Sequence, residues 1–253
     1  MNTLVLLKQV PDTETHIKIS DGKINESSVK WIISPYDEIA LEEAIRIREK
    51  SGGKVTVVSV GPERVSASLR TAYAMGADDA IHIKADDYQM LDSATIAEAI
   101  LKATGDQNYE IILCGRQGID SDNGQVPLIY AAKKNISAII WARKIEISDS
   151  GVLVTCEGDG GEAVYQASYP VVITAQMGMN EPRYPSLKGI MASKKKPIIT
   201  KNISEFGLNF DKLEIVGYEM PPERPAGRII DGGSPEEKAK KLVVALHEEI
   251  KVI

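Results

Sequence analysis

The sequence predicts an α/β fold, in which a parallel β-sheet carries helices on both faces. Four short apolar stretches indicate strands, at residues 4–7, 55–60, 80–83 and 111–114. None of them alternates strictly between apolar and polar residues, and segments with helical spacing lie between them. Strands that are apolar on both sides and joined by helices are typical of a parallel sheet that is covered on both faces.

Three helices are predicted between these strands. Ser34-Pro35 opens the first, residues 63–75 form the second, and Asp92-Ser93 caps the third. The apolar positions of the first and third helices are Ile39, Leu41, Ala44, Ile45, Ile47, Ile96, Ala99, Ile100 and Leu101. These residues would face the sheet.

Two β-hairpins are predicted to interrupt the alternation. Residues 16–24 surround Asp21-Gly22, a strong signal for a tight hairpin turn. A second hairpin is predicted from residue 142 to residue 156, with its tip at residues 149–151. A further buried strand follows Pro170, because residues 171–174 are uncharged and largely β-branched.

Beyond about residue 200 the sequence predicts an extended arm that ends in a helix. Prolines crowd residues 219–228, which therefore cannot hold regular structure. The terminal helix has Ser234 at its N-cap, Pro235 at its first position and Glu237 at the capping-box position. Its apolar face comprises Ala239, Leu242, Val243, Leu246 and Ile250. We therefore predict two domains, residues 1–200 and residues 201–253.

Composition narrows the classes of function. The net charge of −6 argues against nucleic acid or an anionic membrane as the main partner. Two cysteines are too few for a disulfide framework or a cysteine-rich metal site. No apolar run reaches about 18 residues, so we expect no insertion into a membrane. The first residues enter a strand at once, so we expect no signal peptide and a reducing compartment.

Residues 169–197 are the most informative segment. The buried strand in it gives way to a loop stiffened by Pro182 and Pro185, followed by a short helical piece and by the lysines 194–196. Apolar residues beside a lysine cluster on such a loop indicate a docking surface for another protein. The alternative is a solvated loop whose lysines complement the helix dipole.

Residues 115–126 are a candidate nucleotide loop. In parallel α/β sheets, ligands bind in the loops that follow the strands, and this loop follows the strand that ends at Cys114. Its glycines let backbone amides approach a ligand closely, and Asp122 or Asn123 can cap a helix running toward Tyr130. Helix capping and turn formation alone could also explain the loop.

The segment Asn180-Glu181-Pro182-Arg183-Tyr184, with Leu187, Ile190-Met191 and the lysines, resembles the β subunit of electron-transfer flavoprotein. The resemblance spans nearly the whole chain. In that family this loop recognises partner dehydrogenases through a leucine anchor that matches Leu187. The resemblance implies a docking surface made of Tyr184, Leu187, Ile190 and Met191.

The resemblance also implies partners and a role. The chain would form a heterodimer with an α subunit, on which residues 201–253 would pack. It would dock flavin dehydrogenases such as acyl-CoA dehydrogenases, with a membrane quinone reductase as electron acceptor. Such a subunit carries electrons and is not an enzyme with substrate chemistry of its own. The compartment would be the bacterial cytoplasm, or the mitochondrial matrix in a eukaryote.

Ordinary members of the family hold AMP, which makes the expected sheet Rossmann-like and adenine-nucleotide-binding. The AMP-site positions that the resemblance implies are Leu6, Lys8, Ser34, Pro35, Tyr36, Asp37, Val60, Gly115, Arg116, Gln117, Gly118, Ile119, Asp120, Ser121, Asp122, Asn123, Gly124, Gln125 and Val126. The sequence departs from the family where Leu6 replaces a small residue and where Pro127 replaces a common glycine. Ser121 and Gly124 replace a frequent aspartate and a frequent asparagine.

The redox cofactor of the family is FAD, held mainly by the α subunit. The resemblance places Glu157 and Thr13 beside the flavin, Glu157 within an acidic Gly-Gly segment and Thr13 where some members have an aromatic residue. The match is partial, because the family has a basic residue at the position of Cys156 and an acid or amide at that of Ala163.

Two alternatives remain. In the electron-bifurcating branch of the family, the β subunit holds a second FAD in place of AMP, but the Asn-Glu-Pro-Arg-Tyr loop and Asp159-Gly160-Gly161 favour the ordinary branch. A stand-alone adenine-nucleotide-binding enzyme on a similar sheet is the alternative from another class. The sequence shows no catalytic triad, no Walker loop and no histidine pair with the spacing of metal ligands. His82 and Cys114 are expected to be core residues.

Overall fold

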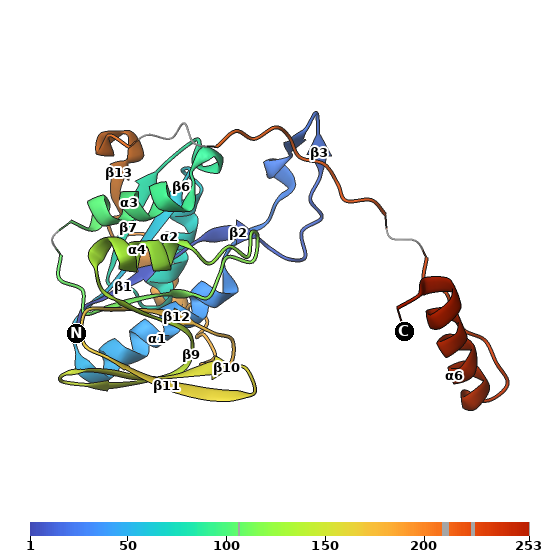
Figure 1. Ribbon diagram of the computed structural model, residues 1–253. Helices are drawn as coiled ribbons and strands as arrows, with labels where there is room; N and C mark the ends of the chain where they lie inside the picture. The colour runs from blue at the N-terminus through green and yellow to red at the C-terminus, as the bar shows by residue number, and fades with distance from the viewer. Residues whose placement is uncertain (106, 209–212, 224–225, 253) are drawn as a thin grey trace. The chain divides into compact units, whose positions relative to one another are not determined.

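The chain forms a nine-stranded sheet with helices packed on it (Figure 1). The computed structural model describes residues 1–105, 107–208, 213–223 and 226–252. The chain divides into two compact units, Met1–Gly217 and Tyr218–Ile253. The whole sheet lies in the first unit.

The sheet is mostly parallel, in the strand order β11-β10-β9-β12-β8-β1-β6-β7-β13. Its strands are β1 (Thr3–Leu6), β6 (Val55–Gly61), β7 (Asp79–Lys84), β8 (Ile111–Gly115), β9 (Ser137–Ser148), β10 (Gly151–Gly158), β11 (Gly161–Ala167), β12 (Val171–Ala175) and β13 (Ile199–Asn202). Neighbours from β9 to β13 pair parallel, and the pairs β9–β10 and β10–β11 are antiparallel. The predicted α/β fold is confirmed.

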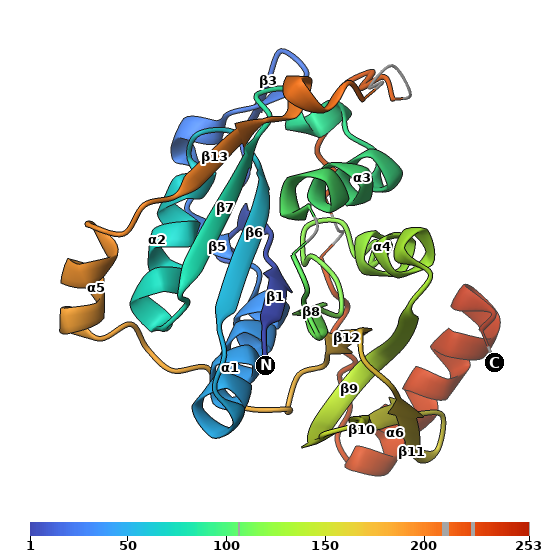
Figure 2. The ribbon, with the colours of Figure 1, turned by 90° about the vertical axis from the view of Figure 1, so that its left-hand side faces the viewer.

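Helices cover both faces of the sheet (Figure 2). Helices α1 (Pro35–Ser51) and α2 (Val65–Met75) pack on one face, against Val5 and Leu113. Helices α3 (Ser93–Thr104) and α4 (Val126–Lys134) pack on the other face, against Leu4 and Ile112. Successive strand residues point to opposite faces, so apolar runs without alternation are needed to fill both cores.

The predicted helix starts and core residues are largely confirmed. The carboxylate of Asp92 accepts a hydrogen bond from the amide of Thr95 at 2.6 Å, which caps α3. His82 is buried in β7 and its Nε2 lies 3.0 Å from the carbonyl oxygen of Gly61, as expected of a satisfied core histidine. Cys114 is buried, and burial raises the pKa of its thiol well above the usual value.

The predicted N-cap of α4 is wrong. The helix begins after Gln125, which makes no side-chain cap. Asp122 has a φ of 50°, and its carboxylate accepts a hydrogen bond from the Gln117 side-chain amide at 2.7 Å. Asn123 donates instead to the Ser93 hydroxyl at 3.1 Å. Both polar side chains therefore close the loop and tie it to α3.

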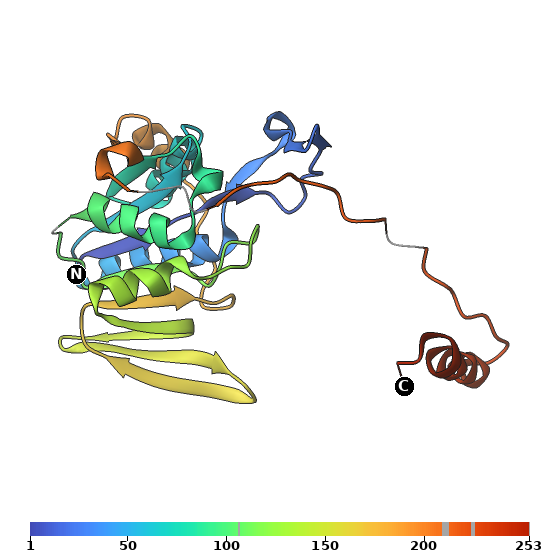
Figure 3. The same cartoon turned by 45° about the horizontal axis from the view of Figure 1, so that its top comes forward.

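Both predicted hairpins are present. The strands β3 (Ile19–Ser20) and β4 (Lys23–Ile24) pair across Asp21-Gly22, and β9 pairs with β10 across residues 149–150. β9 begins before the predicted hairpin, because its first residues pair with β12. The same strand thus belongs to the parallel sheet and to the hairpin, and β11 follows as an edge strand (the yellow strands in Figure 3). A separate ribbon joins β2 (Gln9–Pro11) to β5 (Trp31–Ile33).

The second unit contains the predicted terminal helix, α6 (Pro235–Val244), which continues as the π-helical segment η4 (Ala245–Ile250). The Ser234 hydroxyl accepts from the amide of Glu237 at 3.2 Å, and Glu237 accepts from the amide of Ser234 at 3.3 Å, so the capping box is confirmed. Leu242, Val243 and Ile250 of its apolar face are exposed. The described part of residues 219–228 has no regular structure, as predicted. Arg224, Pro225, residues 209–212 and Ile253 of the predicted arm lie outside the described residues.

Candidate functional site

The order of the strands reverses between β1 and β8. The chain leads from β1 outward through β6 and β7 on one side, whereas β8 borders β12 and β9 on the other. In open parallel sheets, ligands bind in the crevice beyond the carboxyl ends of the strands at such a switch point. Lys8 follows β1 here, and residues 116–125 follow β8.

Lys8 joins the two loops. Its ammonium group donates to Asp120 Oδ1 at 2.7 Å and to Ser121 Oγ at 3.3 Å. An exposed ion pair of this kind contributes little to stability, about 1 kcal/mol or less. The pair therefore leaves a lysine and a carboxylate at the mouth of the crevice where a ligand can contact both.

Asp37 closes the floor of the crevice. One carboxylate oxygen accepts a hydrogen bond from the amide of Lys8 at 2.7 Å, and the other accepts from the amide of Gly115 at 2.7 Å. The side chain from the first turn of α1 thus bridges the ends of β1 and β8. Burial raises the pKa of Asp37 to about 7, although the two amide hydrogen bonds and the charge of Lys8 act in the opposite direction. The charge of Asp120 adds to the rise.

The loop after β8 has free donors and little room for side chains. Across the described residues, the amides of Gly118, Ile119 and Gly124 donate to no acceptor. A Cβ atom on Gly118 would lie 2.7 Å from Asp120 Oδ1 and 2.9 Å from Lys8 Cδ. Free backbone amides beside a lysine can donate hydrogen bonds to an anion. The residues present therefore fit the phosphate group of a nucleotide.

Arg116 stacks on Trp141, a contact that the sequence reasoning missed. The guanidinium carbon of Arg116 lies 4.7 Å from the centre of the indole ring, and its buried Nε makes no hydrogen bond to any described residue. Trp141 has a φ of 60°, and its amide donates to the Thr174 hydroxyl at 2.9 Å. This conformation accompanies a register shift between β9 and β12. No local pattern in the sequence predicts that shift.

The other predicted nucleotide residues lie near the carboxyl ends of the strands or at the starts of α1 and α4. The Ser34 hydroxyl donates to the carbonyl oxygen of Gln117 at 3.5 Å, and the backbone of Tyr36 lies directly against Gly115. Leu6 and Val60 are at the ends of β1 and β6, where they pack in the core beneath α3 and α4. Pro35 begins α1, and Val126 begins α4.

The two predicted flavin-adjacent residues lie on different elements. Glu157 is the penultimate residue of β10, where its Oε2 accepts from Arg143 at 2.9 Å and from the Gln176 side-chain amide at 2.8 Å. These hydrogen bonds lower the pKa of Glu157 and keep it ionised. Thr13 is exposed on the turn after β2. No hydrogen bond joins the two residues in the described structure.

Both departures from the family beside Glu157 belong to one pair. Cys156 on β10 and Ala163 on β11 stand directly opposite each other in the antiparallel register. Side chains at such positions contact one another, so a basic residue and an acid or amide would interact there. In this chain the two paired residues, Cys156 and Ala163, are both uncharged.

A second candidate site is the segment of residues 180–197, here called the docking segment. Helix α5 (Leu187–Ser193) lies in it, capped by the Ser186 hydroxyl, which accepts from the amide of Gly189 at 3.0 Å. Tyr184 is 94% exposed, Leu187 76% and Met191 66%, and Ile190 is also exposed. The structure therefore brings the four predicted docking residues onto one short segment with their apolar side chains uncovered.

Comparisons with known proteins identify the family of the chain. The family model described as "Electron transfer flavoprotein domain" matches residues 21–205. The electron transfer flavoprotein subunit beta of Bacillus subtilis is 40% identical over 258 residues, covering 100% of both chains. The protein of the same name from Syntrophomonas wolfei is 38% identical over 253 residues, covering 100% of this chain and 98% of its own.

A membrane-spanning role finds no support in the helices. None that the structure describes is both long and apolar enough to cross a bilayer.

The family match covers most of the sheet, and the two relatives match over the full length of this chain. The chain therefore belongs to the family of electron transfer flavoprotein β subunits.

Proposed function

We propose that the chain binds an α subunit, completes the FAD site of that subunit, holds AMP in the crevice between β1 and β8, and docks dehydrogenases through the docking segment. The observation that carries the docking role is the exposure of Tyr184, Leu187 and Met191 on a segment that is otherwise fastened to the sheet domain. Exposed aromatic and aliphatic side chains on a fixed backbone are typical of interface anchors.

AMP fits the crevice by its chemistry. The free amides of the loop after β8 and the ammonium of Lys8 would hold the phosphate. Asp120 and Asp122 supply acceptors for ribose hydroxyls, and Asp37 keeps the two strand ends in place. Leu6 adds apolar surface beneath the site. AMP in this role is structural.

FAD supplies the redox chemistry, and the α subunit would hold most of it. Glu157 and Thr13 are the residues of this chain that we propose to lie near the flavin. The hydrogen bonds from Arg143 and Gln176 fix the Glu157 carboxylate, so it presents a localised negative charge. Residues 201–253 would pack on the α subunit, where the exposed apolar face of α6 would be covered.

Electrons would pass from flavin dehydrogenases such as acyl-CoA dehydrogenases, through this protein, to a membrane quinone reductase. The chain itself performs no substrate chemistry in this proposal. We propose the cytoplasm as its compartment, since the relatives described above come from bacteria.

Counting nucleotides tests the cofactor assignment. The chain is coexpressed with its α subunit, and the purified complex is denatured to release bound nucleotides. We expect one FAD and one AMP per heterodimer. Two FAD would contradict AMP and indicate the bifurcating branch, whereas one FAD alone would show that the crevice holds no nucleotide.

Replacing Leu187 by alanine tests the docking surface. We expect electron transfer from a reduced dehydrogenase to fall about tenfold, with unchanged FAD content, because the variant loses an exposed anchor worth roughly 1.4 kcal/mol or more. The rate is measured by following reduction of the FAD in the α-subunit complex, at a concentration of that complex that does not saturate the dehydrogenase. Leu153→Ala, an exposed leucine on β10, is the matched control and should keep the natural rate. Equal rates in Leu187→Ala and the control would refute the docking role.

A further inference from the structure

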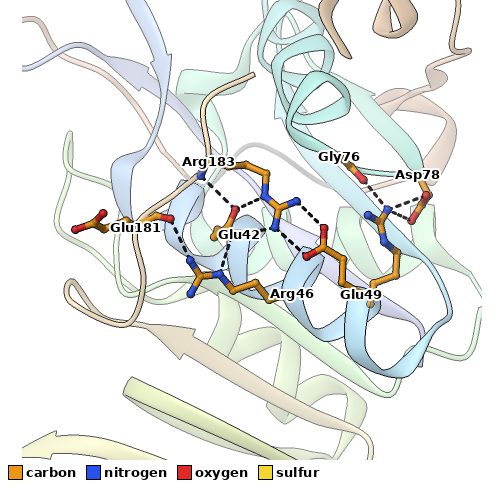
Figure 4. Close-up of polar contacts among 8 residues, drawn as sticks. Glu42, Arg46, Glu49, Gly76, Asp78, Glu181 and Arg183 are labelled. Atoms are coloured by element: carbon orange, nitrogen blue, oxygen red, sulfur yellow. Dashed lines mark hydrogen bonds and ion pairs between the residues drawn. The ribbon is translucent and has the colours of Figure 1, made fainter. Parts of the chain in front are cut away.

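The docking segment is fastened to α1 by a network of charged side chains (Figure 4). Arg183 is at the centre of this network, and in the sequence it lies two residues after Glu181 and directly before Tyr184. Glu42, Arg46 and Glu49 project from α1 toward the loop. The two partners of Arg183 are more than 130 residues away in sequence, at separations of 141 and 134.

Arg183 uses its whole guanidinium group in this network. Its Nε donates to Glu42 Oε2 at 2.7 Å and its Nη2 to Glu42 Oε1 at 3.1 Å. The same group donates to both oxygens of Glu49, at 2.6 Å from Nη1 and 3.1 Å from Nη2. The backbone amide of Arg183 donates to Glu42 as well, at 3.2 Å. Two-pronged contacts of a planar guanidinium fix direction as well as distance.

The network includes a buried carboxylate, and its ion pairs keep the acidic side chains ionised. The Glu42 side chain is only 3% exposed. Burial raises the pKa of Glu42, but the hydrogen bonds from Arg183 and Arg46 outweigh it and leave the pKa lowered. Arg183 likewise lowers the pKa of Glu49, and the two carboxylates raise that of Arg183. A buried carboxylate stripped of its partner is costly, so the loop is strongly held while the network is complete.

Neighbouring contacts complete the attachment before Arg183. The Asn180 side-chain amide donates to the carbonyl oxygen of Ile39 at 3.1 Å and to Glu43 at 3.0 Å. Arg46 donates to Glu42 at 2.6 Å and to the carbonyl oxygen of Glu181 at 3.3 Å. The loop is therefore bound to α1 at residues 180, 181 and 183.

The far end of the docking segment is bound to α2 instead. A Cβ atom on Gly189 would lie 2.4 Å from the carbonyl oxygen of Ala74, so α5 packs closely on α2. Tyr73 donates its hydroxyl hydrogen to the carbonyl oxygen of Pro197 at 2.5 Å, and Lys196 donates to that of Ala77 at 2.8 Å. Residues 184–186 lie between the two attachments, and the anchor Leu187 directly follows them as the first residue of α5.

The two helices are themselves joined. Arg48 of α1 donates to the carbonyl oxygen of Gly76, just after α2, at 2.7 Å, and to both oxygens of Asp78 at 2.9 and 3.0 Å. Asp78 in turn accepts from the amide of Val55 at 2.9 Å. Arg48 therefore ties α1 to the loop that follows α2, so the two helices that hold the docking segment are joined (Figure 4).

We propose that Arg183 is a positioning residue for docking, which holds Tyr184 and Leu187 in their binding-competent arrangement through Glu42 and Glu49. This inference rests on the proposed docking role of the segment. A loop that is already ordered in the free protein loses little conformational freedom when it binds. Preorganisation therefore increases affinity without adding a contact. Arg183 would therefore control how well the dehydrogenase binds and would leave the flavin chemistry unchanged.

Two variants of the α-subunit complex test the proposal: Arg183→Ala and Arg183→Lys. Glu42 keeps Arg46 as a partner in both, so the fold should survive. With a reduced acyl-CoA dehydrogenase as electron donor, we expect Arg183→Ala to raise the apparent KM about tenfold and to change kcat less than about twofold. Lysine keeps the charge but cannot make two-pronged contacts with the two carboxylates, so Arg183→Lys should recover only part of the affinity.

Trypsin gives an independent reading of local order. Lys188 is exposed within the docking segment. If Arg183 holds the segment, the initial rate of cleavage after Lys188 should rise about tenfold in Arg183→Ala while the midpoint of global unfolding changes little. Faster cleavage with an unchanged KM would overturn the proposal, because the network would then serve the fold alone. An unchanged KM and an unchanged cleavage rate would overturn it as well.

Leu187→Ala separates this proposal from the proposed docking role. If Leu187→Ala raises KM and Arg183→Ala does not, the surface docks the dehydrogenase and the positioning role of Arg183 is wrong. If neither substitution changes KM, the docking role itself is wrong and the positioning role falls with it.

Discussion

The Asp37→Asn variant is expected to gain stability relative to the natural chain as the pH rises from 5 to 8, by about 3 kcal/mol. Burial raises the pKa of Asp37 to about 7, from an ordinary value of 3.8. Between these two values the folded chain keeps a proton on Asp37 that the unfolded chain has released. Folding therefore binds a proton in this range, and the natural chain loses stability as the pH rises through it.

The geometry explains why the effect is concentrated in this residue. The carboxylate is buried where β1 and β8 end, and two amide hydrogen bonds and the nearby charge of Lys8 compensate its burial in part. Asparagine has nearly the same shape but no charge, so it removes the titration. It also presents an N–H group to one of the two amides. We therefore expect lower stability of the variant at pH 5, with a difference that shrinks toward pH 8.

Urea unfolding at intervals from pH 5 to pH 8 measures the difference between the two chains. Asp12→Asn is the matched control. The hydrogen bond from Lys30 lowers the pKa of this partly buried aspartate, so its contribution is lost only below about pH 4 and should be constant from pH 5 to 8. If the difference in free energy of unfolding between the two chains stays the same from pH 5 to pH 8, then Asp37 does not bind a proton on folding.

The order of elements in the first unit could be predicted from the sequence because each signal is local. The run Val171 to Thr174 has no charge and many β-branched residues, and it forms a strand buried on both faces. Ser34-Pro35 and Asp92 begin helices as their chemistry predicts. The strand order could not be predicted, since β12 lies between β8 and β9 in space although it follows both in the chain.

The candidate crevice was partly predictable. The rule that ligands bind beyond the carboxyl ends of parallel strands is enough to associate Lys8 with the loop after β8. The bridge made by Asp37 depends on where α1 packs and on the register of β1 with β8. The same limit applies to Arg183 and Glu42, because their separation of 141 residues leaves no local trace. Asn123 shows the converse, since a side chain suited to a cap bonds to Ser93 when the tertiary fold brings a hydroxyl near.

The Gly115→Ala variant is expected to be destabilised by roughly 3 kcal/mol or more and to retain no nucleotide. A Cβ atom at this position would lie 2.5 Å from the Cβ of Tyr36, 2.6 Å from Asp37 Oδ1 and 2.7 Å from the carbonyl carbon of Tyr36. All three atoms belong to the first turn of α1, which is packed on the sheet and cannot retreat without opening the core. The strand end and the helix therefore must separate, which breaks the hydrogen bond from Gly115 to Asp37.

The expected loss has a local cause that a control can isolate. Gly161→Ala on β11 adds the same methyl group where no atom lies within 4 Å. Its free energy of unfolding should therefore lie within about 0.5 kcal/mol of that of the natural chain. Denaturant unfolding compares the two variants, and release of bound nucleotide from each α-subunit complex measures the effect on the crevice. Equal stability of the two variants would show that α1 can move away from the end of β8. Nucleotide retained by a destabilised Gly115→Ala would instead show that the crevice does not depend on the bridge between α1 and the two strands.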